Sequence, residues 1–249
     1  MKISIITVTF NSQDFLENCI SSVETQTYPN IEHIVIDGNS TDNTLNILKN
    51  KSNIKWISEN DYGIYDAMNK GIEMATGDVI GILNSDDFFA DEHVISRVVD
   101  AFVKNKGIQA VYADVCFVKR DGTAKKLRYY SSKYFKPFMF RMGMQPAHPT
   151  FYVKKELFEK YGLYRTDLKI AGDFELLLRF LLKSQVKYKY VNDLWVKMRV
   201  GGISTSGVKS VIKLNSEILK SLRENKVYSN VLIIYSKYFY KWWGFVFKR

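Results

Sequence analysis

The sequence has few of the residues that build disulfide frameworks, zinc sites or flexible linkers. Its 249 residues include two cysteines, three histidines, four prolines and 14 glycines. Cys19 and Cys116 form no CxxC pair, so we expect a chain without disulfides in a reducing compartment. The scattered histidines argue against a zinc site built from His and Cys. The low proline and glycine content argues against long linkers.

Long apolar runs are also absent. The first eight residues contain too short an apolar run for a signal peptide. No uncharged apolar run reaches the length of a membrane-spanning helix. We therefore expect the chain to work in the cytoplasm, where it can still lie on a membrane surface.

The composition is that of a globular protein with a basic surface. Hydrophobic residues make up 46% of the chain and charged residues 25%, and the formal net charge is +10. Such a charge suits nucleic acid, an anionic membrane surface or a phosphorylated substrate. The length fits one large α/β domain or two small ones.

Short β-branched runs alternate with helical patterns in the first hundred residues. The predicted strands span residues 3–10, 33–37, 55–58 and 79–83. The predicted helices span residues 15–23, about 41–49 and 65–75. Ser12 is the expected N-cap of the first helix, and Ser40 or Thr41 that of the second. This alternation predicts a mostly parallel, Rossmann-like sheet with helices on both faces.

The pattern changes after about residue 105. Residues 109–118 alternate loosely, and Asp121-Gly122 predicts a hairpin turn. Helices are expected over residues 156–161, 174–183 and 208–222. No clean linker separates the two halves, so we expect the second half to pack onto the first as one domain.

Polar residues follow three of the predicted strands. Thr9 and Asn11 follow the first, Asp37 follows the second, and the run Asn84-Ser85-Asp86-Asp87 follows the fourth. Because ligands bind beyond the carboxyl ends of parallel strands, these groups predict one site on one rim.

The adjacent acids Asp86 and Asp87 repel each other unless a cation lies between them. Hard oxygen ligands suit magnesium or manganese, usually shared with substrate phosphates. A polar turn followed by helix-capping acids is the alternative interpretation. Asp37 can accept an N–H from a nucleotide base, or it can simply be a turn aspartate before Gly38.

Several motifs in order give the chain a resemblance to a known family. Residues 4–11 (SIITVTFN), 35–44 (VIDGNSTDNT) and 81–89 (GILNSDDFF) resemble the nucleotide-sugar half of family-two inverting glycosyltransferases of the GT-A fold. Residues 61–71 are similar to bacterial exopolysaccharide, O-antigen and colanic-acid members. The resemblance continues through 145–151 and 171–175 and covers roughly residues 1–205.

The resemblance implies a nucleotide-sugar donor and a divalent metal, Mn²⁺ or Mg²⁺. Asp86 and Asp87 correspond to the acidic metal motif. The implied donor-binding residues are Thr9, Asn11, Asp37, Asp66, Lys70, Asn84, Asp86 and Arg199. Two positions depart from the family. Asn84 stands where an acid is usual, so the site has one fewer negative charge. Met68 stands where many relatives carry an arginine, and Lys70 is the candidate replacement.

Asp173 is the expected general base. It precedes a predicted helix whose N-terminal dipole helps keep the carboxylate ionised, and one base acting in a single displacement inverts the anomeric carbon. The residue pattern alone also fits an ordinary N-cap. Glu175 is the alternative base or a sugar contact. His148 faces the acceptor or donor sugar by resemblance, with a structural loop histidine as the alternative.

Two further segments are candidates for phosphate binding. Arg199, with Gly201-Gly202-Ile203-Ser204, resembles the mobile loop that closes over the diphosphate in relatives, and arginine suits bidentate phosphate contacts. Tyr65 and Asp66 begin a helix whose free N–H groups can face phosphate or sugar. A surface arginine before a turn and ordinary helix-start residues are the alternatives.

The chain is expected to divide into residues 1–105 for the donor, 106–205 for the acceptor and a tail over 206–249. The tail has no acid after Glu224. Its aromatic and basic residues can line opposite faces of a helix, which favours a membrane interface over packing on the domain. These residues are Tyr235, Lys237, Tyr238, Phe239, Lys241, Trp242, Trp243, Phe245, Phe247 and Lys248.

The sequence therefore predicts a metal-dependent inverting glycosyltransferase of surface polysaccharide assembly. A UDP-sugar is the favoured donor, because Asp37 can take the uracil imide N–H, and a GDP-sugar stays open. The acceptor is a glycan or a polyprenyl-diphosphate-linked saccharide, and the expected location is the cytoplasmic face of the inner membrane. The alternatives are a non-enzymatic protein that binds nucleic acid or membrane, or a nucleotidyltransferase. No nucleic-acid motif is present, and no glycine-rich triphosphate loop follows the first strand.

Overall fold

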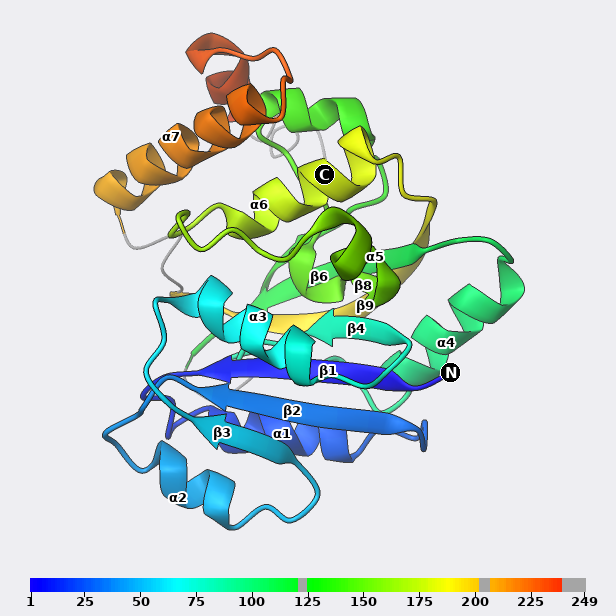
Figure 1. The fold of residues 1–249 in the computed structure, drawn as a ribbon, viewed down its shortest axis with the longest axis vertical. Helices are drawn as coiled ribbons and strands as arrows, with labels where there is room; N and C mark the ends of the chain where they lie inside the picture. The colour runs from blue at the N-terminus through cyan, green and yellow to red at the C-terminus, as the bar shows by residue number, and fades with distance from the viewer. Residues whose placement is uncertain (121–124, 202–206, 239–249) are drawn as a thin grey trace.

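The structure, a computed structural model, describes residues 1–120, 125–201 and 207–238. The first half forms a parallel sheet as predicted. It contains β1 (Ile3–Thr9), β2 (Ile31–Asp37), β3 (Lys55–Ser58) and β4 (Val79–Ile82), with β1 central between β2 and β4 (Figure 1). β1, β2 and β4 are buried runs rich in isoleucine and valine, as parallel strands covered on both faces require, whereas the edge strand β3 is partly exposed.

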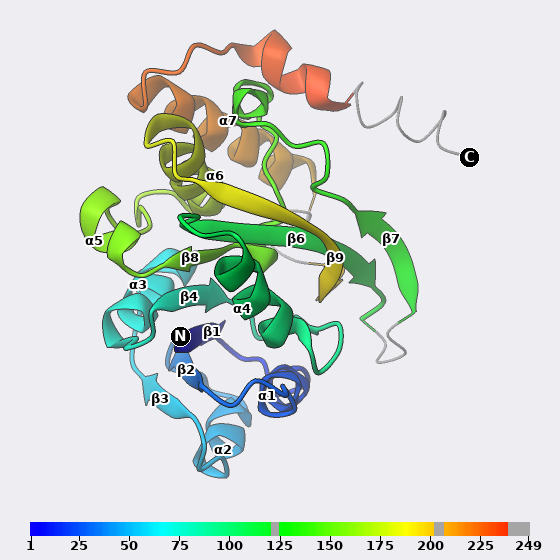
Figure 2. The same ribbon diagram turned by 90° about the vertical axis from the view of Figure 1, so that its right-hand side faces the viewer.

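The second half extends the same sheet. The strand order among the described residues is β3-β2-β1-β4-β8-β6-β9-β5, and β7 pairs with β6. The added strands are β5 (Phe88–Phe89), β6 (Ala110–Val118), β7 (Lys126–Tyr130), β8 (Tyr152–Lys154) and β9 (Tyr188–Arg199). β8 runs antiparallel to both β4 and β6, so β6 and β9 end on the same rim as β4. Figure 2 shows β7 beside β6, on the far side of the sheet from β3. One continuous sheet thus agrees with the expected packing of the two halves.

Helices cover both faces of the sheet. One face carries α3 (Ile64–Met74), α5 (Glu156–Tyr161), α6 (Gly172–Leu177) and α7 (Val208–Glu224), which share one apolar core with β1, β4 and β6. α1 (Leu16–Glu24), α2 (Thr44–Lys49) and α4 (Val94–Lys104) cover the other face. The described residues also include the short helical segments η1 (Pro137–Met142), η2 (His148–Thr150) and η3 (Leu178–Lys183), the last continuing α6, and a helical segment over residues 231–238.

The predicted helix caps are wrong. α1 begins at Leu16 without a side-chain cap, and the Ser12 hydroxyl instead contacts the Ser85 hydroxyl at 2.9 Å. α2 begins at Thr44, and the Ser40 hydroxyl donates to Asp37 at 2.5 Å. These hydroxyls connect loops of the rim to one another, and that contact between distant segments replaces the local cap.

Several predictions lie outside the described residues. They are the turn Asp121-Gly122, the loop residues Gly202, Ile203 and Ser204, and the tail residues Phe239, Lys241, Trp242, Trp243, Phe245, Phe247 and Lys248. Strands β6 and β7 pair antiparallel on either side of that turn. Within the described part of the chain, we find no helix long and apolar enough to cross a bilayer.

Candidate active site

The polar ends of β1, β2 and β4 meet on one rim, as predicted. Thr9 pairs with Asp37 at the end of the β1–β2 ladder, and the Leu83 N–H donates to the Ile6 carbonyl beside it. Asn11 connects the loops after β1 and β2. Its side-chain oxygen accepts from the Thr41 N–H at 2.9 Å, and its backbone lies in the left-handed region with φ 47°, a conformation that asparagine tolerates well.

Asp37 lies where the resemblance expects it, but its carboxylate is already occupied. The side chain is fully buried and accepts bonds from the Ser40 N–H, the Ser40 hydroxyl and the Ser58 hydroxyl, at 2.5–3.0 Å. These bonds give both carboxylate oxygens partners inside the protein. A base N–H would have to join or displace a serine hydroxyl here.

The turn from Asn84 to Asp87 carries oxygens without partners. The side-chain oxygens Asn84 Oδ1, Asp87 Oδ2 and Thr9 Oγ1 are buried and have no hydrogen-bond partner in the part of the chain described. Burial, together with the charge of Asp86, raises the pKa of Asp87 well above its ordinary value. Unpaired buried oxygens are costly unless a ligand completes them. Hard oxygen donors beside one another fit a magnesium or manganese ion.

Asn84, Asp86 and Asp87 would not surround a metal ion on all sides. Among the described residues, no cluster of three or more His, Cys, Asp or Glu side chains can hold a metal ion. Two carboxylates and one amide leave coordination positions for other oxygens. A metal bound through few protein groups and substrate phosphates is the usual magnesium arrangement. The residues present therefore fit a metal shared with a diphosphate.

Arg199, the last residue of β9, lies against this turn. One of its terminal nitrogens donates to the Asp86 carbonyl at 2.7 Å, and the guanidinium carbon lies 4.6 Å from the centre of the Phe88 ring. Arg120 and Arg199 both stack on Phe15, at 4.4 and 5.2 Å. Arg120, Phe15 and Phe88 were not predictable as site residues, because no local sequence pattern connects them with Arg199. Two guanidinium groups beside the Asn84–Asp87 turn form a candidate anion site.

Asp66 and Lys70 lie on the first turns of α3, at the same rim. Lys70 pairs with Glu59 at 2.7 Å and lies 3.5 Å from Asp66. The hydrogen bond to Glu59 raises the pKa of Lys70. Lys70 is thus a cation near the predicted donor, but in this arrangement its charge is shared by two carboxylates.

Asp173, in the first turn of α6, is surrounded by polar groups from distant segments. Its Oδ2 accepts from the Gln145 amide at 2.7 Å and lies 3.1 Å from His148 Nδ1. Its Oδ1 lies 3.3 Å from the Tyr65 hydroxyl. Since Tyr65 has one proton and a shorter bond to the Ile170 carbonyl, at 2.8 Å, Oδ1 is the less occupied oxygen. The side chain of Asp173 is 15% exposed, so it can meet a substrate.

Two elements hold the segment before Asp173. The Glu217 carboxylate on α7 accepts from the N–H groups of Lys169, Ile170 and Ala171, at 2.8–3.1 Å. On the other side, a Cβ at Gly172 would lie 2.7 Å from the Tyr65 ring, so only glycine fits there. This role of Glu217 was not predictable from the sequence, because a charged residue on an amphipathic helix normally faces solvent.

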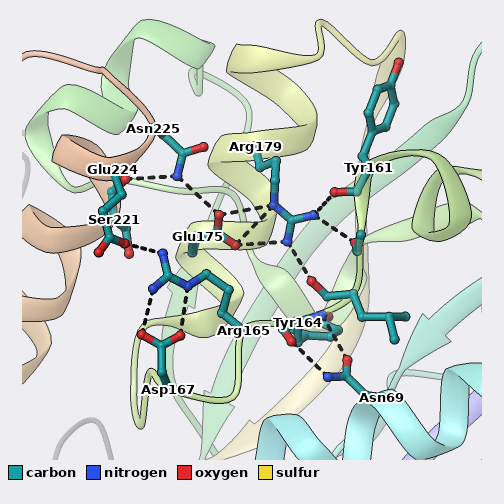
Figure 3. Close-up of polar contacts among 12 residues, drawn as sticks. Asn69, Tyr161, Tyr164, Arg165, Asp167, Glu175, Arg179, Ser221, Glu224 and Asn225 are labelled. Carbon is teal, nitrogen blue, oxygen red and sulfur yellow. Dashed lines mark hydrogen bonds and ion pairs between the residues drawn. The ribbon is translucent and has the colours of Figure 1, made fainter.

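The structure does not bring Glu175 to the site. Successive helix residues differ by about 100°, so Glu175 points away from Asp173 on the same helix. Its buried carboxylate pairs with Arg179 at 3.0 Å and accepts from Asn225 (Figure 3). Arg179 also donates to the carbonyls of Tyr161, Gly162 and Leu163. Glu175 therefore connects α6 to the loop after α5 and to the end of α7.

Sequence comparison agrees with this geometry. Residues 4–162 match the family described as Glycosyl transferase family 2. An uncharacterized glycosyltransferase of Mycobacterium tuberculosis is 34% identical over 184 residues, which cover 72% of this chain and 69% of the relative. A PGL/p-HBAD biosynthesis glycosyltransferase of Mycobacterium bovis is 26% identical, covering 88% of this chain and 83% of that protein.

Solved structures share the fold at low sequence identity. A fragment of S. aureus TarS in complex with UDP-GlcNAc superposes with a TM-score of 0.67 at 19% identity, covering 89% of this chain and 66% of the fragment. A Pyrobaculum calidifontis mannosyltransferase in complex with GDP-Man and Mn²⁺ gives 0.60 at 16% identity, covering 88% and 64%. The chain thus spans about two-thirds of these structures. With the fold and the motif order both confirmed, the chain belongs to Glycosyl transferase family 2 and is a glycosyltransferase.

Proposed function

We propose that the protein is a metal-dependent inverting glycosyltransferase that takes a UDP-sugar as donor. The observation that carries this is the set of buried oxygens on Thr9, Asn84 and Asp87 that have no hydrogen-bond partner among the described residues, at the rim that also holds Arg199. The TarS fragment that shares the fold is in complex with UDP-GlcNAc, which supports a UDP-sugar. The GDP-Man complex of the mannosyltransferase keeps a GDP-sugar as the alternative.

In this proposal the nucleotide lies across the ends of β1 and β2. Asp37 accepts the imide N–H of the base, which displaces or joins a serine hydroxyl, and Thr9 and Asn11 contact the nucleoside. Arg199 pairs with the diphosphate through its planar guanidinium. Lys70 and the N-terminus of α3 add positive potential on the sugar side.

Asn84, Asp86 and Asp87 would hold the divalent metal together with the diphosphate oxygens. When bound, such a metal neutralises the negative charge that develops on the departing diphosphate. The amide at Asn84 supplies a donor oxygen but no charge.

Asp173 acts as the general base in this scheme. Its Oδ1 takes the proton of the acceptor hydroxyl while that oxygen bonds to the anomeric carbon. The bond from the anomeric carbon to the phosphate oxygen breaks in the same step, and its electron pair leaves with the nucleoside diphosphate. Gln145 and His148 hold Oδ2, which fixes the carboxylate for transfer.

A lipid-linked acceptor at a membrane surface is part of the proposal. α7 and the helical residues 231–238 expose large apolar side chains, among them Val208 at 76% and Leu232 at 82%. Exposed apolar side chains beside lysines favour an anionic bilayer surface. Sedimentation with phosphatidylglycerol vesicles tests this part. A Leu232→Ser variant that sediments as well as the wild type would contradict it.

The donor is tested by following the unfolding temperature with UDP, GDP, ADP and CDP, with and without Mn²⁺. A ligand that binds only the folded state raises the midpoint. We expect the largest rise for UDP with Mn²⁺. Asp37→Asn should reduce it, while Asp78→Asn should not, because Asp78 precedes β4 on the opposite rim of the sheet, where it accepts from the Lys2 N–H. No rise with any nucleotide would contradict the proposal.

A further inference from the structure

A central segment of the chain is strongly basic. Between residues 122 and 155 there are eight lysines and arginines and no aspartate or glutamate. The described part of this segment includes β7 and the loop that leads to η1. Neither the family motifs nor the proposed donor site uses this charge.

Tyrosines lie among these cations at the surface. Tyr129 on β7 is 45% exposed and Tyr134 is 62% exposed. Lys126 Nζ lies 5.5 Å from the centre of the Tyr129 ring, and Lys133 Nζ lies 5.6 Å from that of Tyr134. We call the surface formed by Lys126, Tyr129, Lys133 and Tyr134, with Tyr190 of β9, the tyrosine shelf.

A buried carboxylate fixes this shelf. Asp114 on β6 is 1% exposed and accepts from the hydroxyls of Tyr129 and Tyr190 at 2.7 and 2.9 Å. Its other oxygen accepts from the Ser132 N–H at 2.7 Å. Both rings are therefore held in place before any ligand arrives, which lowers the entropy cost of binding. Burial raises the pKa of Tyr190 to about 12, so its hydroxyl stays protonated.

The tyrosine shelf lies next to residues 145–148, which contact the candidate base Asp173. The Ala147 N–H donates to the Ser132 hydroxyl at 3.0 Å, and the Tyr130 hydroxyl donates to the Gln145 carbonyl at 2.7 Å. Gln145 in turn bonds to Asp173. A chain of sugars with one end at Asp173 can therefore continue over the shelf without crossing the donor side of the rim.

We propose that the tyrosine shelf binds an anionic saccharide, and that the acceptor of the reaction carries carboxylate or phosphate groups. Aromatic faces stack on sugar rings, and lysines pair with the anionic groups between them. The anion has two possible sources, a uronate within the glycan or the diphosphate of a lipid carrier. The link to the acceptor depends on the proposed function, but saccharide binding to the shelf does not.

Three probes of different chemistry test the shelf without any nucleotide. They are a hyaluronan oligosaccharide, which alternates a uronate with N-acetylglucosamine, an uncharged chitin oligosaccharide of equal length, and farnesyl diphosphate. Binding is measured by saturation-transfer NMR and by titration calorimetry with the full chain. We expect hyaluronan to bind and chitin to bind at least about tenfold more weakly, with affinity falling as salt rises. Farnesyl diphosphate has no sugar ring. Its binding in addition to hyaluronan would show that a lipid diphosphate can also supply the anion, and its binding alone would overturn the saccharide proposal.

Matched variants locate the binding. Lys126→Gln with Lys133→Gln should weaken the anionic probe roughly fivefold, as loss of two surface charge contacts predicts. Lys49→Gln with Lys51→Gln removes the same charge at the end of α2, beside β3 at the opposite edge of the sheet, and should leave binding unchanged. Tyr129→Ala should weaken binding more than Tyr129→Phe, which keeps the ring.

Several results of these experiments would overturn the proposal. They are equal binding of hyaluronan and chitin, no binding of hyaluronan, or equal losses in the two double-lysine variants. Stronger binding of a single-stranded RNA oligonucleotide than of both anionic probes would also overturn it, in favour of a nucleic-acid surface. If the UDP response fails while the shelf still binds, the donor proposal is wrong and the shelf stands.

Discussion

The Gln145 amide donates to Asp173 Oδ2 at 2.7 Å, although 28 residues separate the two in the chain. His148 lies 3.1 Å from the same oxygen. Both neighbours therefore fix one carboxylate oxygen and leave Oδ1 for the substrate. A structural N-cap would instead bond to the N–H groups of its own helix, and no such side-chain cap is present at the start of α6.

Asp173→Asn should abolish sugar transfer while leaving nucleotide binding intact. Asparagine keeps the hydrogen bond from Gln145 but cannot take the proton of an acceptor hydroxyl. We expect at least about a hundredfold loss in the rate of UDP release, measured with the UDP-sugar that gives the largest thermal shift. Full activity of the variant would remove Asp173 from the chemistry.

Asp87→Asn should keep or raise the unfolding temperature of the protein without metal, and should remove its response to Mn²⁺. Burial raises the pKa of Asp87, so the folded state disfavours its charged form, and a neutral side chain of the same shape removes that cost. Without metal, the variant should unfold at the same or a higher temperature. The part of the UDP shift that requires Mn²⁺ should disappear. If that part survives in Asp87→Asn and is lost in Asp86→Asn, Asp86 is the metal ligand.

Glu175→Gln should destabilise the fold without changing the chemistry. Glu175 and Arg179 form a buried ion pair, and removing one partner of such a pair typically costs about 3–5 kcal/mol. The free energy of unfolding is measured by urea titration. The turnover rate, measured well below the unfolding temperature, should match the wild type. A loss of turnover in a fully folded variant would return Glu175 to the candidate bases.

His33 should make the fold less stable in mild acid. His33 is a buried residue of β2, and its ring bonds to Thr7 of β1 at 2.9 Å. Burial lowers its pKa from 6.5 to about 3. Below pH 6.5 the unfolded chain takes up a proton that the folded chain does not. The stabilisation is therefore complete above about pH 6.5 and is lost as the pH falls towards 3, by up to about 1.4 kcal/mol per pH unit.

His33→Gln tests this pH dependence. The variant removes the titrating ring, so its free energy of unfolding should fall less steeply than that of the wild type between about pH 4 and pH 6. Urea titrations of both proteins at several pH values give the comparison. Parallel pH profiles would mean that carboxylates alone set the acid sensitivity.

The sequence predicted the parts of the fold that have a local pattern. β3 and α5 have the predicted bounds, and β1 ends one residue early at Thr9. β9 was missed, because its burial is irregular and the polar pair Asn192-Asp193 interrupts the alternation that begins at Tyr188 and resumes at Val196. The caps at Ser12 and Ser40 were wrong for a similar reason, since contacts across the rim replaced local ones.

The candidate site also contains residues that a local sequence pattern predicts and residues that only the fold brings together. Thr9, Asp37 and Asn84 were predictable, because they directly follow buried strands that end on one rim. Glu175 was misplaced, because its ion pair depends on how α6 packs against its neighbours. Arg120 and Glu217 come from segments with no motif, so only the fold brings them to the site.

The anomeric configuration of the released sugar tests the central claim most directly. In the absence of an acceptor, water can take the place of the acceptor hydroxyl, and proton NMR identifies the first anomer formed before mutarotation. A UDP-α-sugar with Mn²⁺ should release the β-anomer first, and Asp173→Asn should release neither. If the α-anomer forms first, the transfer retains configuration, and the single-base mechanism assigned to Asp173 is contradicted.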